Sequence, residues 1–164
     1  MKTALKTSVI LSWFNLIVAC FFVFIGLVAA LTMGPQLGLV AVVLFGAIGL
    51  HSYESLRLRR SIIYNAPMDR KTPLSLQIMG FIAMFFSFVT VSNGFVLFRY
   101  AKETAQEVQK TYPEQFKQLE NMNVAGLYQF AAGIMVVFGL AVLVNVLMSM
   151  SLLRWYRSQN QDQE

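Results

Sequence analysis

The 164-residue chain contains a single cysteine, Cys20, and a single histidine, His51. Cys20 has no second cysteine with which to form an internal disulfide, a CxxC redox motif or a zinc cluster. A di-iron bundle needs several inward glutamates and two Glu-x-x-His pairs, and haem held by two histidines would need two copies of this chain. We therefore expect no metal and no cofactor in the single chain.

The motifs of the common catalytic sites are also missing. The sequence has no GxSxG, no HExxH and no phosphate-binding loop, so it offers no set of nucleophile and base. The long apolar runs carry no Asp, Lys or Arg near their middle, which argues against an ion-coupled transporter. The sequence predicts that the protein is not an enzyme.

Charge is scarce, and its scarcity sets the class of the protein. Charged residues make up 13% of the chain and hydrophobic residues 57%, whereas a soluble domain is about 25% charged and 45–50% apolar. The net charge is +5, but the basic residues cluster at the ends of apolar runs, where membrane topology places them. We expect an integral membrane protein with the lipid bilayer as its partner and no nucleic acid.

The apolar runs predict an all-α integral membrane fold, a bundle of four transmembrane helices in a single domain. A tight turn at residues 34–36 makes the first two helices antiparallel neighbours. The predicted parts are four spans at 8–33, 37–56, 74–98 and 124–153, a loop at 57–73, an external segment at 99–123 and a tail at 154–164.

The loop at 57–73 indicates the orientation of the bundle. It contains five basic residues and a single acid, Asp69. Loops rich in Lys and Arg stay in the cytoplasm. Both termini also carry basic residues, which places them on the same side, as an even number of spans requires. We expect a protein of the bacterial inner (plasma) membrane, with N- and C-termini cytoplasmic. The basic residues of the loop are Arg57, Arg59, Arg60, Arg70 and Lys71.

Small residues recur every third or fourth position in the third span and beyond it. They share one helix face and predict one continuous helix that packs closely against a neighbour and then leaves the membrane. Pro113 ends that helix, and a capping box predicts a second short helix at 113–121, so that 99–123 forms a small external cap. The seam residues are Gly80, Ala83, Ser87, Thr90, Gly94, Leu97, Ala101, Thr104 and Val108.

Similar seams mark the first and fourth spans. In the first span the seam residues are Ser12, Asn15, Ala19, Phe22, Gly26 and Ala29. In the fourth span they are Ala125, Gln129, Ala132, Val136, Gly139, Leu143 and Val146.

Four uncharged polar side chains lie inside the predicted spans. Side chains of this kind bond across helices in most membrane bundles, each contributing about 0.6–2 kcal/mol, and we favour that role over a pore lining. The four are Asn15, Asn93, Gln129 and Asn145.

His51 and Glu54 lie on one helix face because three residues separate them. A buried acid beside a histidine is a candidate for proton relay or metal binding. The alternative, which we favour, is that Glu54 pairs with Arg57 and that His51 forms an interhelical hydrogen bond.

The basic cluster of Arg57, Arg59, Arg60, Arg70 and Lys71 has two interpretations. It is a candidate surface for anionic lipid head groups or an acidic partner. Alternatively, topology alone explains it.

The chain has more large aromatics than one small bundle can bury. Many must face lipid or another protein, and our leading hypothesis is a non-catalytic accessory or scaffolding subunit of a larger membrane complex, or a homo-oligomer. The alternative is an oligomeric small channel or transporter with Asn15, Asn93 or Asn145 facing a shared path, and a redox carrier using His51 and Glu54 ranks last. The aromatics are Phe21, Phe22, Phe24, Phe81, Phe85, Phe86 and Phe88.

Overall fold

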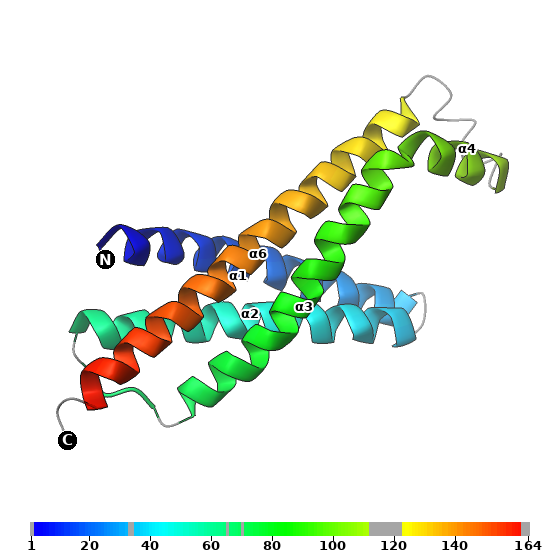
Figure 1. The fold of residues 1–164 in the computed structure, drawn as a ribbon. Helices are drawn as coiled ribbons and strands as arrows, with labels where there is room; N and C mark the ends of the chain where they lie inside the picture. Colours follow the sequence, from blue (N-terminus) through cyan, green and yellow to red (C-terminus); the bar gives the residue numbers. More distant parts are fainter. Residues whose placement is uncertain (1, 33–34, 65, 70, 112–122, 162–164) are drawn as a thin grey trace. The chain divides into compact units, whose positions relative to one another are not determined.

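In the computed structural model, the described residues are helical apart from short connections (Figure 1). The structure describes the chain except residues 1, 33–34, 65, 70, 112–122 and 162–164, and except the side chains of 2–4, 37 and 160–161. The helices are α1 (Lys2–Thr32), α2 (Pro35–Tyr64), α3 (Thr72–Arg99), α4 (Ala101–Thr111) and α6 (Val124–Gln161).

Four of these helices are long and apolar enough to cross a membrane. The 30 residues of α2 extend about 45 Å, and the 38 of α6 about 57 Å, against a hydrocarbon core of about 30 Å. The prediction of an all-helical bundle with four helices that could span a membrane is confirmed at this level. The candidate spans are Leu5–Thr32, Gly38–Tyr64, Thr72–Arg99 and Val124–Gln159.

The second helix is longer than the span predicted for it. It continues from Leu56 to Tyr64, so the connection to α3 covers residues 65–71 rather than 57–73. Packing explains the extension, because Leu58 and Arg59 are both buried beyond the predicted end. The sequence marks this stretch by its charge, and charge alone does not end a helix that still has neighbours.

The third helix stops earlier than the continuous helix we expected. A turn at Tyr100 separates α3 from α4, and Figure 1 shows α4 leaving the direction of α3. Backbone bonding still crosses the turn, since the Tyr100 N–H donates to Val96 and the Thr104 N–H donates to Tyr100. The second short helix, predicted at 113–121, lies outside the described residues.

The chain forms two compact units: residues 1–86 with 141–164, and residues 87–140. In the first unit α1 and α2 lie side by side and antiparallel (Figure 1). Phe22 stacks on Phe45 with ring centroids 4.6 Å apart. The closest approach is at Gly38, where an added Cβ would lie 2.4 Å from the Gly26 carbonyl oxygen, so this position of α2 admits only glycine.

Apolar packing in the first unit is centred on one leucine cluster. Its members come from α2, α3 and α6, and they are Leu58, Leu76, Leu152 and Leu153. Each is nearly or fully removed from the surface. This cluster holds the ends of three helices together near the 65–71 connection.

The second unit contains the part of the small-residue seam that begins at Ser87. Ser87, Thr90 and Gly94 of α3 are buried. The Ser87 hydroxyl donates to the carbonyl of Gly139, and a Cβ on Gly94 would meet Val136 at 2.7 Å. The predicted close packing of this α3 face is therefore present, with α6 as the neighbour.

Candidate functional site

Three buried hydroxyls and one amide form a polar core in the first unit. The Ser12 hydroxyl donates to Asn145 Oδ1 at 2.9 Å and lies 3.2 Å from Ser55 Oγ. Ser55 Oγ lies 2.6 Å from Ser149 Oγ, which donates in turn to the Asn145 carbonyl. The three hydroxyls supply three hydrogens to four contacts, so one contact lacks a hydrogen in any arrangement.

The four predicted interhelical polar residues fall into two pairs. Asn15 and Asn145 are buried, and the Asn15 Nδ2 group donates to the Ala141 carbonyl at 3.5 Å. Asn93 and Gln129 are exposed, on α3 and α6 respectively. Asn93 is the residue before the buried Gly94, and that offset of one position turns its amide off the packed face.

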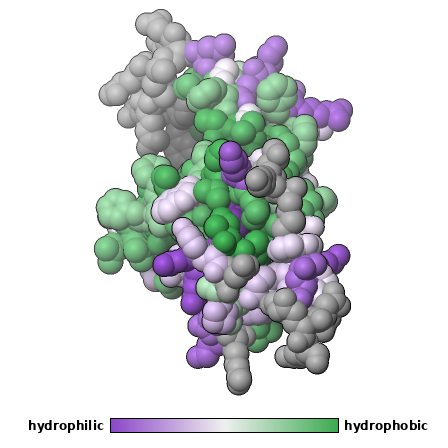
Figure 2. Space-filling view, turned by 90° about the vertical axis from the view of Figure 1, so that its left-hand side faces the viewer, coloured by the Kyte–Doolittle hydropathy of each residue, from purple (hydrophilic) through white to green (hydrophobic). Residues whose placement is uncertain are grey.

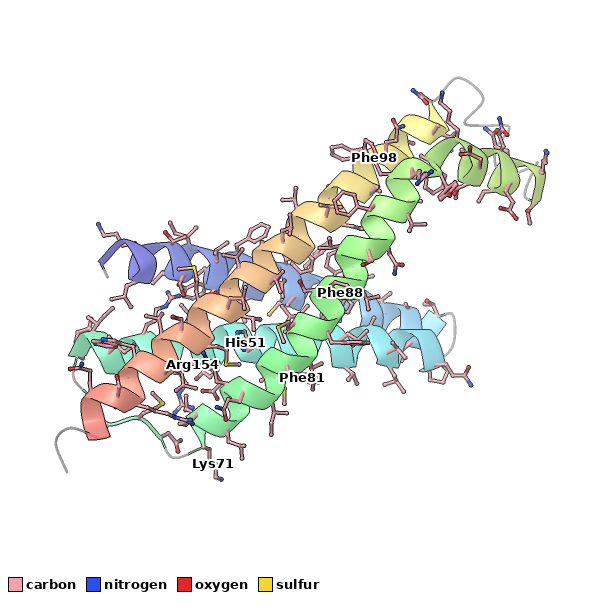
Figure 3. All side chains as sticks on the ribbon, in the orientation of Figure 1. His51, Lys71, Phe81, Phe88, Phe98 and Arg154 are labelled. Carbon is pink, nitrogen blue, oxygen red and sulfur yellow. The ribbon has the colours of Figure 1, made fainter. Side chains whose placement is uncertain are left out.

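His51 is buried among the helices of the first unit (Figure 3). Its Nδ1 lies 3.3 Å from the carbonyl oxygen of Leu76 on α3. The ring has this place because Gly80 has no side chain, and a Cβ there would lie 3.0 Å from ring atoms of His51. The ring of His51 on α2 therefore contacts the backbone of α3.

Glu54 does not join His51 in a pair. Its side chain is 13% exposed, and its Oε1 lies 3.5 Å from Nη1 of Arg57. Among the described residues, no group of three His, Cys, Asp or Glu side chains is placed to hold a metal ion.

Arg59 lies in the interior and not in the exposed basic cluster to which we assigned it. The side chain is 1% exposed, and its three nitrogens have no hydrogen-bond acceptor among the described residues. It sits on the helix face that carries Ser52 and Ser55, which are seven and four positions earlier and also buried. The spacing from these serines was the signal in the sequence that would have placed it.

Ser8 lies opposite Arg59 in the α1–α2 register. Ser12 meets Ser55 and Phe22 meets Phe45, so antiparallel partners have numbers that sum to about 67, which pairs Ser8 with Arg59. The Ser8 hydroxyl is buried and also has no partner among the described residues. Donors thus accumulate at this end of the polar core.

Two residues of the basic cluster line a hollow of about 650 Å³ beside the C-terminal end of α2, which we call the basic hollow. Arg57 and Arg60 line it, while Lys71, exposed just before α3 (Figure 3), is not part of its lining. Arg70 lies outside the described residues. The lining residues are Tyr53, Arg57, Arg60, Ser61, Tyr64, Ala66, Pro67, Met68, Asp69 and Thr72.

Asp69 is the one acid in the lining of the basic hollow. Its carboxylate accepts the Lys71 backbone N–H at 3.2 Å and lies 3.5 Å from Nη2 of Arg57. The Lys71 hydrogen bond, followed by the Arg57 side chain, lowers the pKa of Asp69 below its ordinary value. Asp69 is therefore ionised at neutral pH and fixes the turn that leads into α3.

A second depression, which we call the apolar groove, runs along the outer face of α1 and α2. Its volume is about 460 Å³ and its lining is almost free of polar atoms. Gly46 and Gly49 form part of its floor, and Cys20, the free cysteine, is exposed in it. The lining residues are Leu16, Ala19, Cys20, Val23, Phe24, Leu27, Phe45, Gly46, Gly49, Leu50 and Tyr53.

Comparison with models of protein families, with curated proteins and with solved structures finds no match to this chain.

Proposed function

We propose that this protein is a non-catalytic accessory or scaffolding subunit of a larger membrane complex, with both termini and the 65–71 connection in the cytoplasm. One observation carries the proposal, a row of exposed rings along α3 that we call the aromatic ridge. It consists of Phe81, Phe85, Phe88 and Phe95, whose exposed fractions are 67%, 65%, 69% and 62%.

The spacing of the ridge supports a helical partner. The rings are separated by four, three and seven residues, which is the repeat of knobs that pack into the holes of a facing helix. The opposite face of α3 carries the small-residue seam that is already packed inside the protein. Since lipid provides no hydrophobic force between helices, a partner that receives these rings gains dispersion contacts that flexible acyl chains match less well.

The surface as a whole is consistent with a membrane setting. Figure 2 shows broad areas of hydrophobic side chains (green) on the exposed face. Phe81 and Phe88 can be followed on α3 in Figure 3. Phe21 and Phe24 of α1 are exposed as well, at 59% and 65%. With Ile10 and Ile17 they form a row of similar helical spacing on α1, and this row is the matched comparison for the ridge.

The test is co-purification after mild detergent extraction, read by native mass spectrometry. We expect the wild-type protein to retain a second copy or another membrane subunit. The variant in which Phe81, Phe85 and Phe88 are all changed to alanine should lose that partner. A matched control changes three similarly exposed residues of α1, Ile10, Ile17 and Phe21, to alanine, and it should keep the partner. A strictly monomeric wild-type particle would contradict the proposal.

A second candidate is an oligomeric channel or transporter, and the position of Asn93 favours it. The Asn93 amide is exposed within the candidate span Thr72–Arg99, where contact with hydrocarbon would leave it without hydrogen-bond partners. A water-filled path shared between copies would satisfy it. Proteoliposome flux that Asn93→Leu reduces, and that Gln129→Leu leaves unchanged, would favour this function over the first.

A further inference from the structure

The basic hollow and the apolar groove meet at one side chain. Tyr53 borders both depressions, and both lie within the first unit of the fold. One depression is polar and charged and the other is almost purely apolar. A ligand that fills both must therefore be amphipathic, with a charged end and a long apolar end.

The charge of the basic hollow selects an anion. Arg57 is shared between Glu54 and Asp69, each at 3.5 Å. Arg60 takes part in no ion pair among the described residues, although it lines the hollow. Glu54 and Asp69 both lie against Arg57, so the positive charge of Arg60 is left to match one phosphodiester.

A buried hydroxyl also lacks a partner at this place. Thr72 lines the basic hollow and is 1% exposed, and its Oγ1 has no hydrogen-bond partner among the described residues. A phosphate oxygen is a strong acceptor for such a donor. Ser61 lines the hollow as well and adds a second hydroxyl.

The location of the two depressions matches the layers of a bilayer. The basic hollow lies where the candidate spans Gly38–Tyr64 and Thr72–Arg99 are joined, and a connection between two spanning helices lies at the level of the lipid head groups. The apolar groove extends from Tyr53 along α2 towards Gly46, away from that end. Its α1 wall, from Leu16 to Leu27, is about 16 Å long at 1.5 Å per residue, a length of acyl-chain scale.

We propose that the first unit binds one anionic phospholipid, with its phosphate in the basic hollow against Arg57, Arg60 and Thr72 and an acyl chain in the apolar groove over Gly46 and Gly49. Tyr53 stands at the junction, where an aromatic ring with a polar end suits the membrane interface. The site shares no residue with the aromatic ridge.

The experiment measures lipid retained by the full-length protein in native mass spectrometry. Phosphatidylglycerol or phosphatidylcholine of the same acyl composition is added to the purified protein in mild detergent. We expect the phosphatidylglycerol adduct to be retained at least tenfold more than the phosphatidylcholine adduct. The head variant Arg57→Gln/Arg60→Gln should reduce that preference at least fivefold. The tail variant Gly46→Leu/Gly49→Leu should reduce the retention of phosphatidylglycerol itself at least fivefold.

Matched controls separate the site from general effects of charge and size. Arg154→Gln/Arg157→Gln removes the same charge from two exposed residues of α6, and Gly133→Leu adds a side chain where nothing lies within 4 Å. Both controls should retain the wild-type preference. Equal retention of the two lipids by the wild type, or equal losses in controls and site variants, would overturn the proposal.

Two further arms distinguish the source of the anion and the nature of the occupant. Inorganic phosphate added at millimolar concentration should not displace the lipid, because it makes no use of the groove. If phosphate displaced the lipid and the tail variant retained as much lipid as the wild type, the hollow would be a simple anion site. That result would overturn the proposal. If the tail variant lost a second protein chain rather than lipid, the groove would belong to a partner helix, and the proposal would also be overturned.

Discussion

Ser12 of α1 donates a hydrogen bond of 2.9 Å to Asn145 of α6 across 133 positions of the sequence. Both side chains are buried, so neither can exchange this bond for one to water. The bond joins the first helix to the last in a part of the protein where apolar burial gains nothing from lipid. It therefore fixes how these two helices meet.

Removing either partner should destabilise the bundle by about 0.6–2 kcal/mol, the range measured for hydrogen bonds between membrane helices. The measurement is a double-mutant cycle of Ser12→Ala and Asn145→Ala, followed by unfolding in mixed micelles. We expect the double variant to lose less than the sum of the single variants, because both remove the same bond. Strict additivity would show that the bond contributes nothing.

Gly38 and Gly46 provide a matched pair on α2. An added Cβ at Gly38 would lie 2.4 Å from backbone oxygen of α1, whereas nothing lies within 4 Å of one at Gly46. Gly38→Ala should therefore separate the two helices and cost about 1–3 kcal/mol. Gly46→Ala should be neutral or stabilising by up to about 1 kcal/mol, since alanine favours helix. The measurement is the unfolding free energy of each variant relative to the wild type. Equal changes for Gly38→Ala and Gly46→Ala would contradict the close approach at Gly38.

The turn before α3 should depend on pH through Asp69. Its carboxylate accepts the Lys71 N–H and pairs with Arg57, so its folded-state pKa lies below its unfolded value. The stabilisation is fully present above the unfolded pKa, about 4, and is lost as pH falls through the lowered folded pKa. We expect the melting temperature difference between wild type and Asp69→Asn to stay constant from pH 7 to pH 5.

Below pH 4 that difference should shrink as Asp69 becomes protonated. The comparison is of melting curves of both proteins at each pH, which cancels the titration of other groups. A difference that shrinks already between pH 7 and pH 5 would mean that the Asp69 pKa is raised, against the contacts with Lys71 and Arg57.

Helical periodicity predicted much of the fold, because side-chain spacing is a local property. The spacing of Gly80, Ala83 and Ser87 predicted the face of α3 that packs against a neighbour, and all three residues are buried. The same reasoning identified Asn15 on the inner face of α1. Gln129 belongs to a predicted seam yet is exposed, because it lies off the face of α6 that carries the buried Val124, Val142 and Val146.

The site residues were harder to predict, because they depend on which helices meet. The sequence shows Arg59 beside Arg57 and Arg60 as one run of positive charge, and only the continuation of α2 to Tyr64 turns Arg59 inward. The meeting of two depressions at Tyr53 also depends on contacts between segments far apart in the chain. Periodicity within a single helix contains no information on the meeting at Tyr53, whereas the spacing of Arg59 from Ser52 and Ser55 indicates its buried face once α2 is known to continue.

The proposed orientation can be tested with single cysteines in a Cys20→Ser background. Lys71, Ser158 and Lys110 are exposed, so a cysteine at each is accessible to a membrane-impermeant maleimide on its own side. We expect Lys71→Cys and Ser158→Cys to react only from the cytoplasmic side, and Lys110→Cys only from the other side. Labelling of Lys71→Cys and Ser158→Cys from opposite sides would refute four spans with both ends inside.

Arg59 has no hydrogen-bond acceptor among the residues that the structure describes, and this determines the expected effect of replacing it. A buried guanidinium without partners is unfavourable, so Arg59→Met, which keeps the length of the side chain, should stabilise the protein by about 1 kcal/mol or more. Arg59→Ala should be less stable than Arg59→Met, because it leaves a cavity. Thermal unfolding of the wild type, Arg59→Met and Arg59→Ala in the same detergent measures both stability differences. Marked destabilisation by Arg59→Met would show that the guanidinium has an acceptor beyond the described residues, and an anion or ordered water would be sought beside Ser8.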